Sequence, residues 1–226
     1  MKQWDTTQSA YTAQELQEHY PDAFDHAREH NADMEWETGY VVESVLEDFT
    51  DNVFPALGLG TLDRKHIDYS LDAYYGGSAG IMSGHCLYVD NLAIFHSALL
   101  GYSAVLDVQK DLPIVKIDRR SRLWNRCSFY FEGTGNRPGT EANVTLDDIE
   151  DLNQSEYDTL EAQADSLAEE LVDWIRAVFA WIPSQVVREY EYLSSAEALI
   201  ESAEANEWYF DESGRIIHVP GDAIDV

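Results

Sequence analysis

A long amphipathic helix, predicted over residues 155–182, constrains the fold of this chain more than any other feature. Its apolar residues follow a 3-4-3-4 spacing, which places them in one stripe along an α-helix. The stripe consists of Tyr157, Leu160, Ala164, Leu167, Leu171, Trp174 and Val178. One side of this helix is therefore expected to face the core.

The other side of the same helix carries a row of carboxylates. Its acidic residues are Asp158, Glu161, Asp165, Glu169 and Asp173, and residues 160–174 contain no Lys or Arg. Four of these acids recur at every fourth residue, so their backbone positions lie about 6 Å apart along the axis. Like charges at this spacing destabilise a helix by roughly a few tenths of a kcal/mol per pair. Phosphates along one DNA strand are also several ångströms apart. The pattern is therefore typical either of a solvated face or of a surface that imitates a phosphate backbone.

Acidic residues dominate the whole chain, but their distribution is uneven. The 226 residues include 43 acidic and 14 basic side chains, a formal net charge of -29, and self-repulsion of this size weakens a compact state. Residues 1–63 contain 14 acids and 2 bases, residues 64–137 contain 7 acids and 9 bases, and residues 138–226 contain 22 acids and 3 bases. We predict three segments with these bounds within one compact domain. Acidity from adaptation to high salt would also be expected in the middle segment.

The N-terminal segment is predicted to form acidic amphipathic helices. Thr12 and Glu15 have the spacing of a capping box, and Pro21 is expected to break or restart the helix over residues 12–30. The next helix has Val42, Val45, Leu46, Phe49 and Val53 at helical spacing. Its acids occupy most of the remaining surface: Glu43, Glu47, Asp48 and Asp51.

The middle segment is predicted to form an antiparallel sheet. Short β-branched and aromatic runs predict strands within residues 66–75, 85–89, 102–108, 112–117 and 127–132. A helix is expected at 90–100, tight turns at the glycines of 76–84, and a polar loop at 132–143. The predicted fold class is α+β, with a central antiparallel sheet flanked by acidic amphipathic helices.

The C-terminal part contains the stretch EYEYLSSAEALIESAEANEWYFDESGR (189–215), a Tyr-rich segment followed by a short helix and an acidic hairpin. This stretch resembles the C-terminal signature of a family of mostly uncharacterised acidic proteins encoded by phages and other mobile elements. IDYSLDAYYGGSAGIMSG (67–84) is similar to the strand and Gly-rich turn of that family, where a Gln-Gly-Asp-Gly core is common and Tyr75-Gly76-Gly77-Ser78 stands here. Folding alone also explains much of the first stretch, since Ser194 and Glu197 are spaced as a capping box and DESG predicts a turn. The resemblance implies an infected bacterial or archaeal cell as the setting, and it carries over no catalytic residues because it says almost nothing about activity.

Patterns for catalysis or for ligands are weak in this sequence. Cys86 and Cys127 are expected to be buried thiols, because no CxxC or HExxH motif accompanies His85 or His96. The glycines of 76–84 lack the Lys-Ser/Thr of a phosphate-binding loop. The acids of 147–151 lack the spacing and glycine of a calcium loop and are interpreted as a solvated helix start. We predict that the protein is not an enzyme and binds no metal and no cofactor.

A basic run interrupts the acidity at residues 116–126. It contains Lys116, Arg119, Arg120, Arg122 and Arg126, with Trp124 among them. This composition is compatible with nucleic-acid contact, but the net charge would repel a phosphate backbone. We favour internal pairing with the acidic flanks, or an interface between protomers, and expect no direct contact with nucleic acid.

The sequence thus favours a binding protein. The hypothesis is a phage-encoded, DNA-mimicking inhibitor of a host nucleic-acid-binding defence protein, of the anti-CRISPR or anti-restriction type, with the acids of 43–51 and 158–173 replacing phosphates. The alternatives are an antitoxin-like acidic protein that neutralises a basic partner and a salt-adapted enzyme. No run of 18 apolar residues and no apolar leader is present, so we expect no membrane association and a location in the cytoplasm of the host cell. The sequence is compatible with a monomer and with a homodimer.

Overall fold

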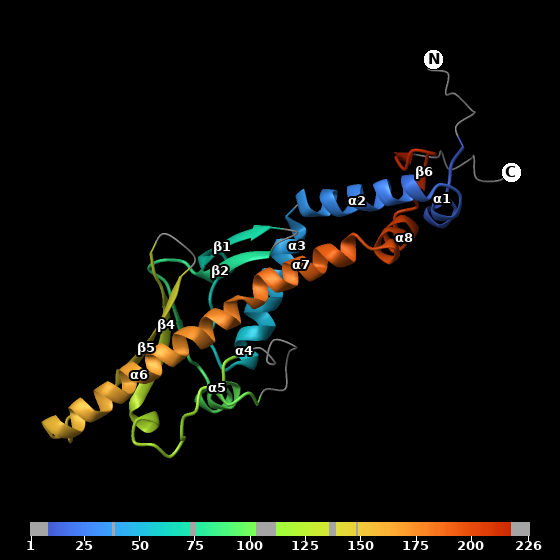
Figure 1. The fold of residues 1–226 in the computed structure, drawn as a ribbon. Helices are drawn as coiled ribbons and strands as arrows, with labels where there is room; N and C mark the ends of the chain where they lie inside the picture. Colours follow the sequence, from blue (N-terminus) through green and yellow to red (C-terminus); the bar gives the residue numbers. More distant parts are fainter. Residues whose placement is uncertain are drawn as a thin grey trace. The chain divides into compact units, whose positions relative to one another are not determined.

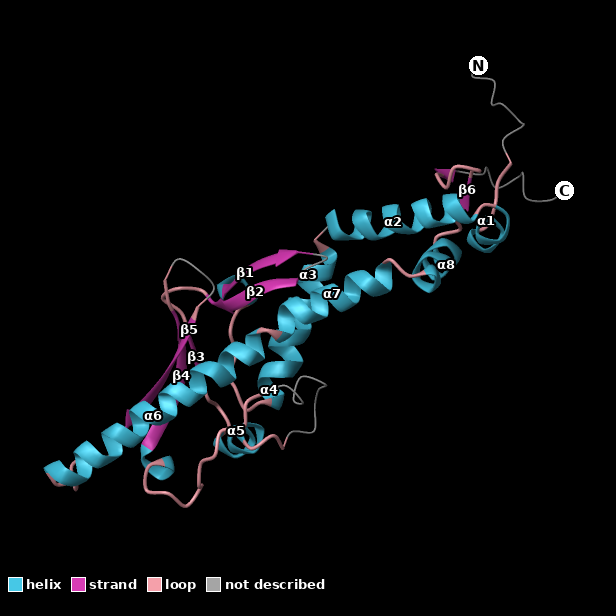
Figure 2. Cartoon of the chain, viewed as in Figure 1, coloured by secondary structure: helices cyan, strands magenta, loops and turns pink. Residues whose placement is uncertain are grey.

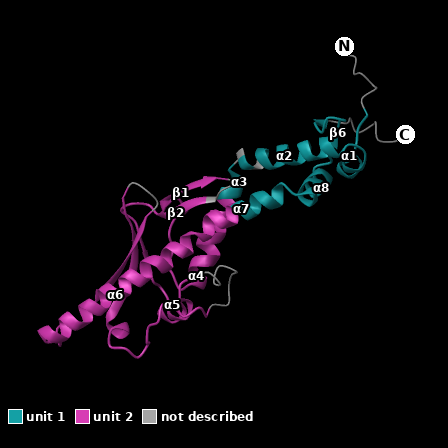
Figure 3. Cartoon of the chain, viewed as in Figure 1, with its two compact units in different colours: residues 1–42, 187–226 teal, residues 43–186 magenta. Residues whose placement is uncertain are grey.

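A computed structural model describes residues 9–37, 39–72, 76–102, 112–135, 139–147 and 149–217. The chain divides into two compact units (Figure 3). Unit 1 contains residues 1–42 and 187–226, and unit 2 contains residues 43–186. This division differs from the charge boundaries at 63 and 137, because each acidic flank contributes residues to both units.

Helices and short antiparallel strands make up the described chain (Figures 1 and 2). The α-helices are α1 (Ala13–His19), α2 (Pro21–Glu37), α3 (Tyr40–Asp48), α4 (Phe54–Ala56), α5 (Leu92–Leu99), α6 (Gln154–Phe179), α7 (Trp181–Leu193) and α8 (Ala196–Ala205). A π-helix, η1 (Phe49–Val53), joins α3 to α4, and 3-10 turns occur at η2 (Arg64–His66) and η4 (Trp124–Arg126). The strands are β1 (Ile67–Asp72), β2 (Gly76–Ile81), β3 (Cys86–Tyr88), β4 (Cys127–Gly133), β5 (Thr140–Leu146), β6 (Tyr209–Phe210) and β7 (Ile216–Ile217).

Unit 2 is built around a three-stranded antiparallel sheet of order β3-β4-β5, with α6 packed along β5 (Figure 1). Phe95 of α5 lies at the centre of an aromatic core. Its ring centroid is 5.4 Å from that of Trp174 in α6, 5.7 Å from that of Phe129 and 6.2 Å from that of Phe131 in β4. Aromatic side chains bury large areas and prefer such edge-on and tilted contacts. The core therefore fixes α6 against one face of the sheet.

A second aromatic cluster in unit 2 holds the end of α6 against η1 and α4. Phe49 lies 4.6 Å from Phe54, 5.3 Å from Phe179 and 5.6 Å from Trp181, measured between ring centroids. Phe49, Phe54 and Phe179 are fully buried. The helical periodicity predicted for residues 42–53 is thus used for packing, although the backbone widens to a π-helix at Phe49–Val53.

Unit 1 joins the two ends of the described chain. Tyr11 pairs with Phe210 through two backbone hydrogen bonds, with N···O distances of 2.9 and 2.8 Å. A buried cluster lies beneath this pair and consists of Ala13, Leu16, Phe24, Ala27, Leu199, Ala203 and Phe210. The hydroxyl of Tyr20 lies 3.3 Å from that of Tyr11, and this hydrogen bond with burial raises the pKa of Tyr20 to about 12. The N-terminal and C-terminal segments therefore fold as one unit.

The α+β class and the antiparallel pairing predicted from the sequence are confirmed, although the described strands form three separate small sheets. The capping box of Thr12 and Glu15 is present, and α2 begins at Pro21. The helices predicted at 90–100 and 155–182 correspond to α5 and α6. The turn predicted after Phe210 connects β6 to β7.

Three predictions for the middle segment are wrong in whole or in part; of the turns predicted at 76–84, the one at Gly84 is present. Residues 76–81 form β2, because Gly77 adopts φ 138° opposite Leu71 and a Cβ there would lie 1.9 Å from the carbonyl oxygen of Ser70. Residues 112–117 form no strand; Pro113 has no N–H to donate to a sheet, and Val115 instead donates to the carbonyl of Leu99. The loop predicted at 132–143 is shorter, since β4 extends to Gly133 and β5 begins at Thr140. Of the strand predicted at 102–108, only Tyr102 lies within the described residues.

Two helix starts also differ from the prediction. The side chain of Ser195, and not that of Ser194, caps α8 by accepting a hydrogen bond from the N–H of Ala198. The hydroxyl of Ser194 donates to the carbonyl of Tyr190 and so closes the preceding helix. The acids of 147–151 precede α6, whose N-cap is Asn153. In both places two or more polar residues compete for the cap, and packing selects among them.

The β6–β7 hairpin should be highly sensitive to one glycine. Gly214 adopts φ 82°, and a Cβ at this residue would lie 2.1 Å from the carbonyl oxygen of Ala23 in α2. Gly39 in the same unit has φ 74°, with no atom within 4 Å of a built Cβ. We expect Gly39→Ala to cost roughly 1–2 kcal/mol, the strain of a left-handed residue. Gly214→Ala should cost about 3 kcal/mol or more, because the backbone contact adds overpacking.

Hydrogen exchange of the α1, α2 and α8 amides, measured for both variants, tests this expectation. Equal loss of protection in the two variants would show that the Gly214–Ala23 contact does not restrict the side chain.

Candidate functional site

Helix α6 provides a rigid support for the acidic row. Asn153 and Glu156 form a reciprocal capping box at its start, where the side chain of Asn153 accepts from the N–H of Glu156. The residues buried along its inner side are Leu160, Ala164, Leu167, Leu171, Trp174, Ile175, Val178 and Phe179. This list extends the stripe predicted from the sequence, except that Tyr157 is only half-buried. Burial on one side fixes which side chains face solvent.

All nine carboxylates predicted as phosphate mimics lie on exposed residues of unit 2. Five are on α6: Asp158, Glu161, Asp165, Glu169 and Asp173. Four are on α3 and η1: Glu43, Glu47, Asp48 and Asp51. The structure therefore places both predicted groups in the same unit, whereas the acids of α1, α2 and α8 belong to unit 1.

Neutralisation along α6 is weak and is confined to the ends of the row. Asp173 lies 3.9 Å from Arg176, with side chains 76% and 60% exposed, and such surface pairs contribute little. Glu161 accepts a hydrogen bond from the hydroxyl of Tyr157 at 3.0 Å, which leaves its charge in place. Within the described part of the chain, Asp165 and Glu169 have no ion pair. The centre of the row is therefore an uncompensated negative surface.

The row also has a defined geometry. A step of four residues exceeds one full turn by about 40°, so the carboxylates from Glu161 to Asp173 wind through about 120° in a right-handed sense. Glu170, which was not among the predicted phosphate mimics, is exposed beside this row. It lies next to Glu169 in the sequence and outside the four-residue repeat of Glu161, Asp165, Glu169 and Asp173.

The acidic group on α3 and η1 is more strongly satisfied by its neighbours. Glu47 lies 3.6 Å from Arg64. Asp48 accepts from the side chain of Asn52 at 2.6 Å, and Asp51 accepts from the hydroxyl of Thr50 at 3.1 Å. The π-helical geometry at residues 49–53 also interrupts the regular spacing that a repeated charge pattern requires. Of the two groups, the row on α6 is therefore the stronger candidate for the site.

Two arginines of the basic run form ion pairs with carboxylates of the same chain, as predicted. Arg126 makes a bidentate contact to Asp151 at 2.5 and 2.7 Å, and Arg122 contacts Glu156 at 2.8 Å. These hydrogen bonds lower the pKa values of both carboxyl groups, with Arg126 the largest cause for Asp151 and Arg122 for Glu156. Lys116, Arg119 and Arg120 are exposed. The two pairs tie the loop before β4 to the start of α6, and thus help to position the row.

Neither cysteine forms a disulfide, and their environments differ. Cys127 is buried, and this burial, assisted by Asp147, raises the pKa of its thiol to about 11. Cys86 is only partly buried, contrary to the prediction, because it lies on the outer face of β3 opposite Glu132. Burial and the charge of Glu132 raise the pKa of its thiol as well. Both thiols are poorly suited to nucleophilic chemistry.

A metal site has no support among the residues that the structure describes, where no group of three or more His, Cys, Asp and Glu side chains could hold an ion. His66 and His85 stack with ring centroids 3.6 Å apart, but they form a pair only. The absence of a metal from the whole chain stays a prediction.

None of the described helices combines the length and apolar character that crossing a bilayer requires. Comparison with protein-family models, with curated proteins and with solved structures finds no match.

The Arg126–Asp151 pair should make the stability of the fold depend on pH. Because the pKa of Asp151 is lower in the folded protein than in the unfolded chain, the pair stabilises the fold above the ordinary Asp pKa of about 3.9. This stabilisation is lost as the pH falls through the lower folded value. In Arg126→Gln, the pKa of Asp151 should rise towards its ordinary value, and NMR titration of the side-chain carboxyl would measure the change. An unchanged pKa would show that Arg126 does not hold this carboxylate in solution.

Thiol alkylation tests the assignment of the cysteines. Thiolates react and thiols do not, so the raised pKa and the burial of Cys127 should both slow its reaction at pH 8. We expect iodoacetamide to modify Cys86 before Cys127, and both more slowly than free cysteine, as followed by mass spectrometry of peptides. Modification of Cys127 in the folded protein at the rate of free cysteine would contradict its burial.

Proposed function

We propose that this protein is a nucleic-acid mimic that inhibits a nucleic-acid-binding protein by presenting the α6 carboxylates to its basic groove. The observation that carries the proposal is the uncompensated centre of the row, Asp165 and Glu169, on a helix whose opposite side is fully packed. A flexible acidic tail would have to lose conformational entropy on binding, whereas these carboxylates are already ordered.

The linear charge density of α6 also supports mimicry of a single strand. Six carboxylates lie between Asp158 and Asp173, a distance of about 22 Å along the helix axis, which gives one charge per about 4 Å. One strand of duplex DNA carries a charge every 3.4 Å or so along its axis. The mean charge density along α6 is therefore close to that of one DNA strand.

The distribution of cations favours a basic partner. Arg64, Lys65, Arg122 and Arg126 pair with carboxylates outside the α6 row. An ordinary solvated helix face mixes both signs and gains i,i+4 pairs, but the centre of this row has none. Repulsion within the row is relieved when a basic surface binds, and attraction between opposite charges accelerates that association.

The resemblance of residues 189–215 to acidic proteins of phages and mobile elements supports a role during infection, with a host defence protein such as a CRISPR effector or a restriction enzyme as the target. The interaction is expected to be between proteins, without catalysis and without direct contact to nucleic acid.

A fourfold amide variant tests the proposal. The variant combines Glu161→Gln, Asp165→Asn, Glu169→Gln and Asp173→Asn, and we expect it to bind the partner more weakly. A carboxylate that is buried against an Arg of the partner should account for about 2 kcal/mol or more of binding free energy, whereas loss of a carboxylate at the exposed rim should mainly slow association. Folding should be unchanged or slightly more stable, because like-charge repulsion is removed. The matched control is Glu18→Gln, Glu29→Gln, Glu189→Gln and Glu191→Gln, which removes four exposed charges from unit 1.

Tagged parent, row variant and control would be incubated with bacterial host lysate, and bound protein would be eluted with duplex DNA. The proposal expects a partner that parent and control retain, that duplex DNA displaces, and that the row variant loses despite an unchanged melting temperature. A partner retained by the folded row variant would exclude α6. Recovery of one small basic protein that duplex DNA does not displace would instead identify an antitoxin, and a fold lost at low ionic strength would identify salt adaptation.

A further inference from the structure

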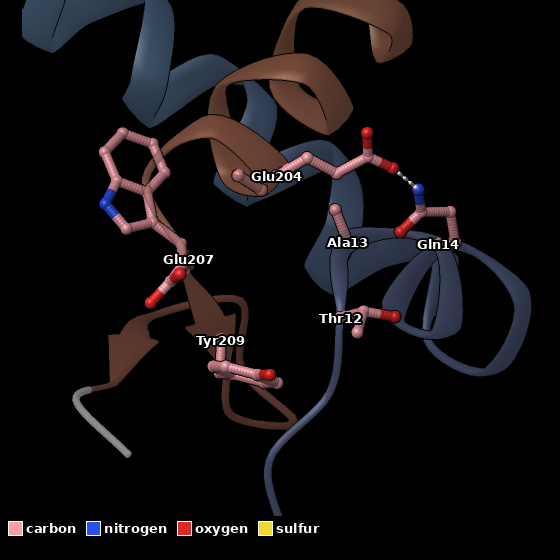
Figure 4. A pocket seen from close by; sticks show the side chains of 8 residues that line it. Thr12, Ala13, Gln14, Glu204, Glu207 and Tyr209 are labelled. Atoms are coloured by element: carbon pink, nitrogen blue, oxygen red, sulfur yellow. Dashed lines mark hydrogen bonds between the residues drawn. The ribbon is translucent and has the colours of Figure 1, made fainter. Parts of the chain in front are cut away.

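A cavity in unit 1 is formed by the two ends of the described chain. Its volume is about 400 Å³, and it lies between the start of α1 and the segment that follows α8 (Figure 4). Thr12 and Gln14 line it from the N-terminal segment, and Glu204, Glu207 and Tyr209 line it from the C-terminal segment. Small-molecule sites in proteins are concave and of this size or larger.

The walls of this cavity are held by the core beneath them. Ala13 and Ala203 line the cavity and also belong to the buried cluster of unit 1. Trp208, which also lines it, packs against the same cluster. The Tyr11–Phe210 backbone pair closes the unit next to the cavity. The cavity is therefore part of the folded structure of unit 1.

Glu207 occupies a backbone position that normally belongs to glycine. The N–H of Trp208 bonds to the carbonyl of Ala203 at 2.9 Å, and the N–H of Glu207 to that of Glu204 at 3.4 Å. These two bonds end α8 in a Schellman motif, whose left-handed residue is usually Gly. Glu207 adopts φ 53° there, and it is the one described non-glycine residue with positive φ. A glutamate at this position costs stability, and it places a carboxylate at the cavity.

The lining of the cavity is suited to an organic cation. Its lining residues include Trp208, Tyr209, Glu204 and Glu207, and they include no Lys or Arg. One oxygen of Glu204 accepts a hydrogen bond from the side chain of Gln14 at 2.5 Å, which fixes that carboxylate (Figure 4). Aromatic faces attract cations, and a guanidinium both stacks on such faces and donates paired hydrogen bonds to carboxylates.

We propose that this cavity binds the side chain of an arginine in an exposed segment of a partner protein. Trp208 and Tyr209 provide the stacking surface, and Glu204 and Glu207 provide the acceptors. The site is independent of the α6 row, which lies in unit 2, so either can fail without the other.

NMR titration of the full chain with N-acetyl-arginine methylamide tests this site. The amide resonances of Thr12, Gln14, Glu207 and Tyr209 should shift saturably. The neutral isostere N-acetyl-citrulline methylamide should leave them unchanged, because it lacks the charge. No saturable shift, or equal shifts with the two probes, would overturn the proposal.

Two variants separate the site from the fold. Glu207→Gly should raise the melting temperature, because glycine adopts positive φ without strain. The same variant should weaken binding of the arginine probe about tenfold, the loss of one charge-assisted contact. Glu18→Gln, which removes one exposed charge elsewhere in unit 1, should keep both properties of the parent. A Glu207→Gly protein that binds the probe as tightly as the parent would show that the cavity does not recognise the cation.

Discussion

Burial of one side of α6 is the constraint on which the rest of unit 2 depends. Trp174 has no exposed surface, and its ring packs against Phe95 and Phe131. Through these contacts one helix joins the sheet and α5, while Phe179 at its end joins the cluster around Phe49. Since full burial of one such side chain stabilises a fold by roughly 1.5–3 kcal/mol, this side can offset repulsion along the acidic side. Packing of the apolar stripe thus allows α6 to carry the uncompensated carboxylates on its exposed side.

The acidic side chains of the two units are stabilised by different kinds of contact. Unit 2 contains the basic run and uses Arg122 and Arg126 to anchor the start of α6, so most of its pairing serves architecture. Unit 1 has 19 acids and 4 bases among its 82 residues. It places acids where the backbone favours them, as at the capping box of Thr12 and Glu15, whose hydrogen bonds lower the pKa of Glu15. Asp211 likewise accepts from the N–H groups of Ser213 and Arg215 in the turn of the hairpin.

Both proposed sites use carboxylates that stability alone would not favour. On α6, like charges repel along the helix, and at Glu207 the side chain occupies a backbone conformation that glycine adopts without cost. Local rules that a sequence breaks without a structural gain often mark function. The two sites complement each other chemically, because a row of carboxylates suits an extended basic groove and a walled cavity suits one cationic side chain.

The sequence alone determined the elements whose information is local. The 3-4-3-4 stripe of α6, the capping box of Thr12 and Glu15, the break at Pro21 and the exposed row from Glu161 to Asp173 all follow from short-range periodicity and hydrogen bonding. Only the tertiary structure decided what depends on contacts distant in sequence. Gly76–Ile81 pairs with β1, which approaches too closely for a side chain at Gly77, and Val115 donates to the carbonyl of Leu99 in α5 instead of to a strand. The cavity could not be read from the sequence, because it requires Gln14 and Glu204 to meet across 190 residues, and no local pattern encodes that separation.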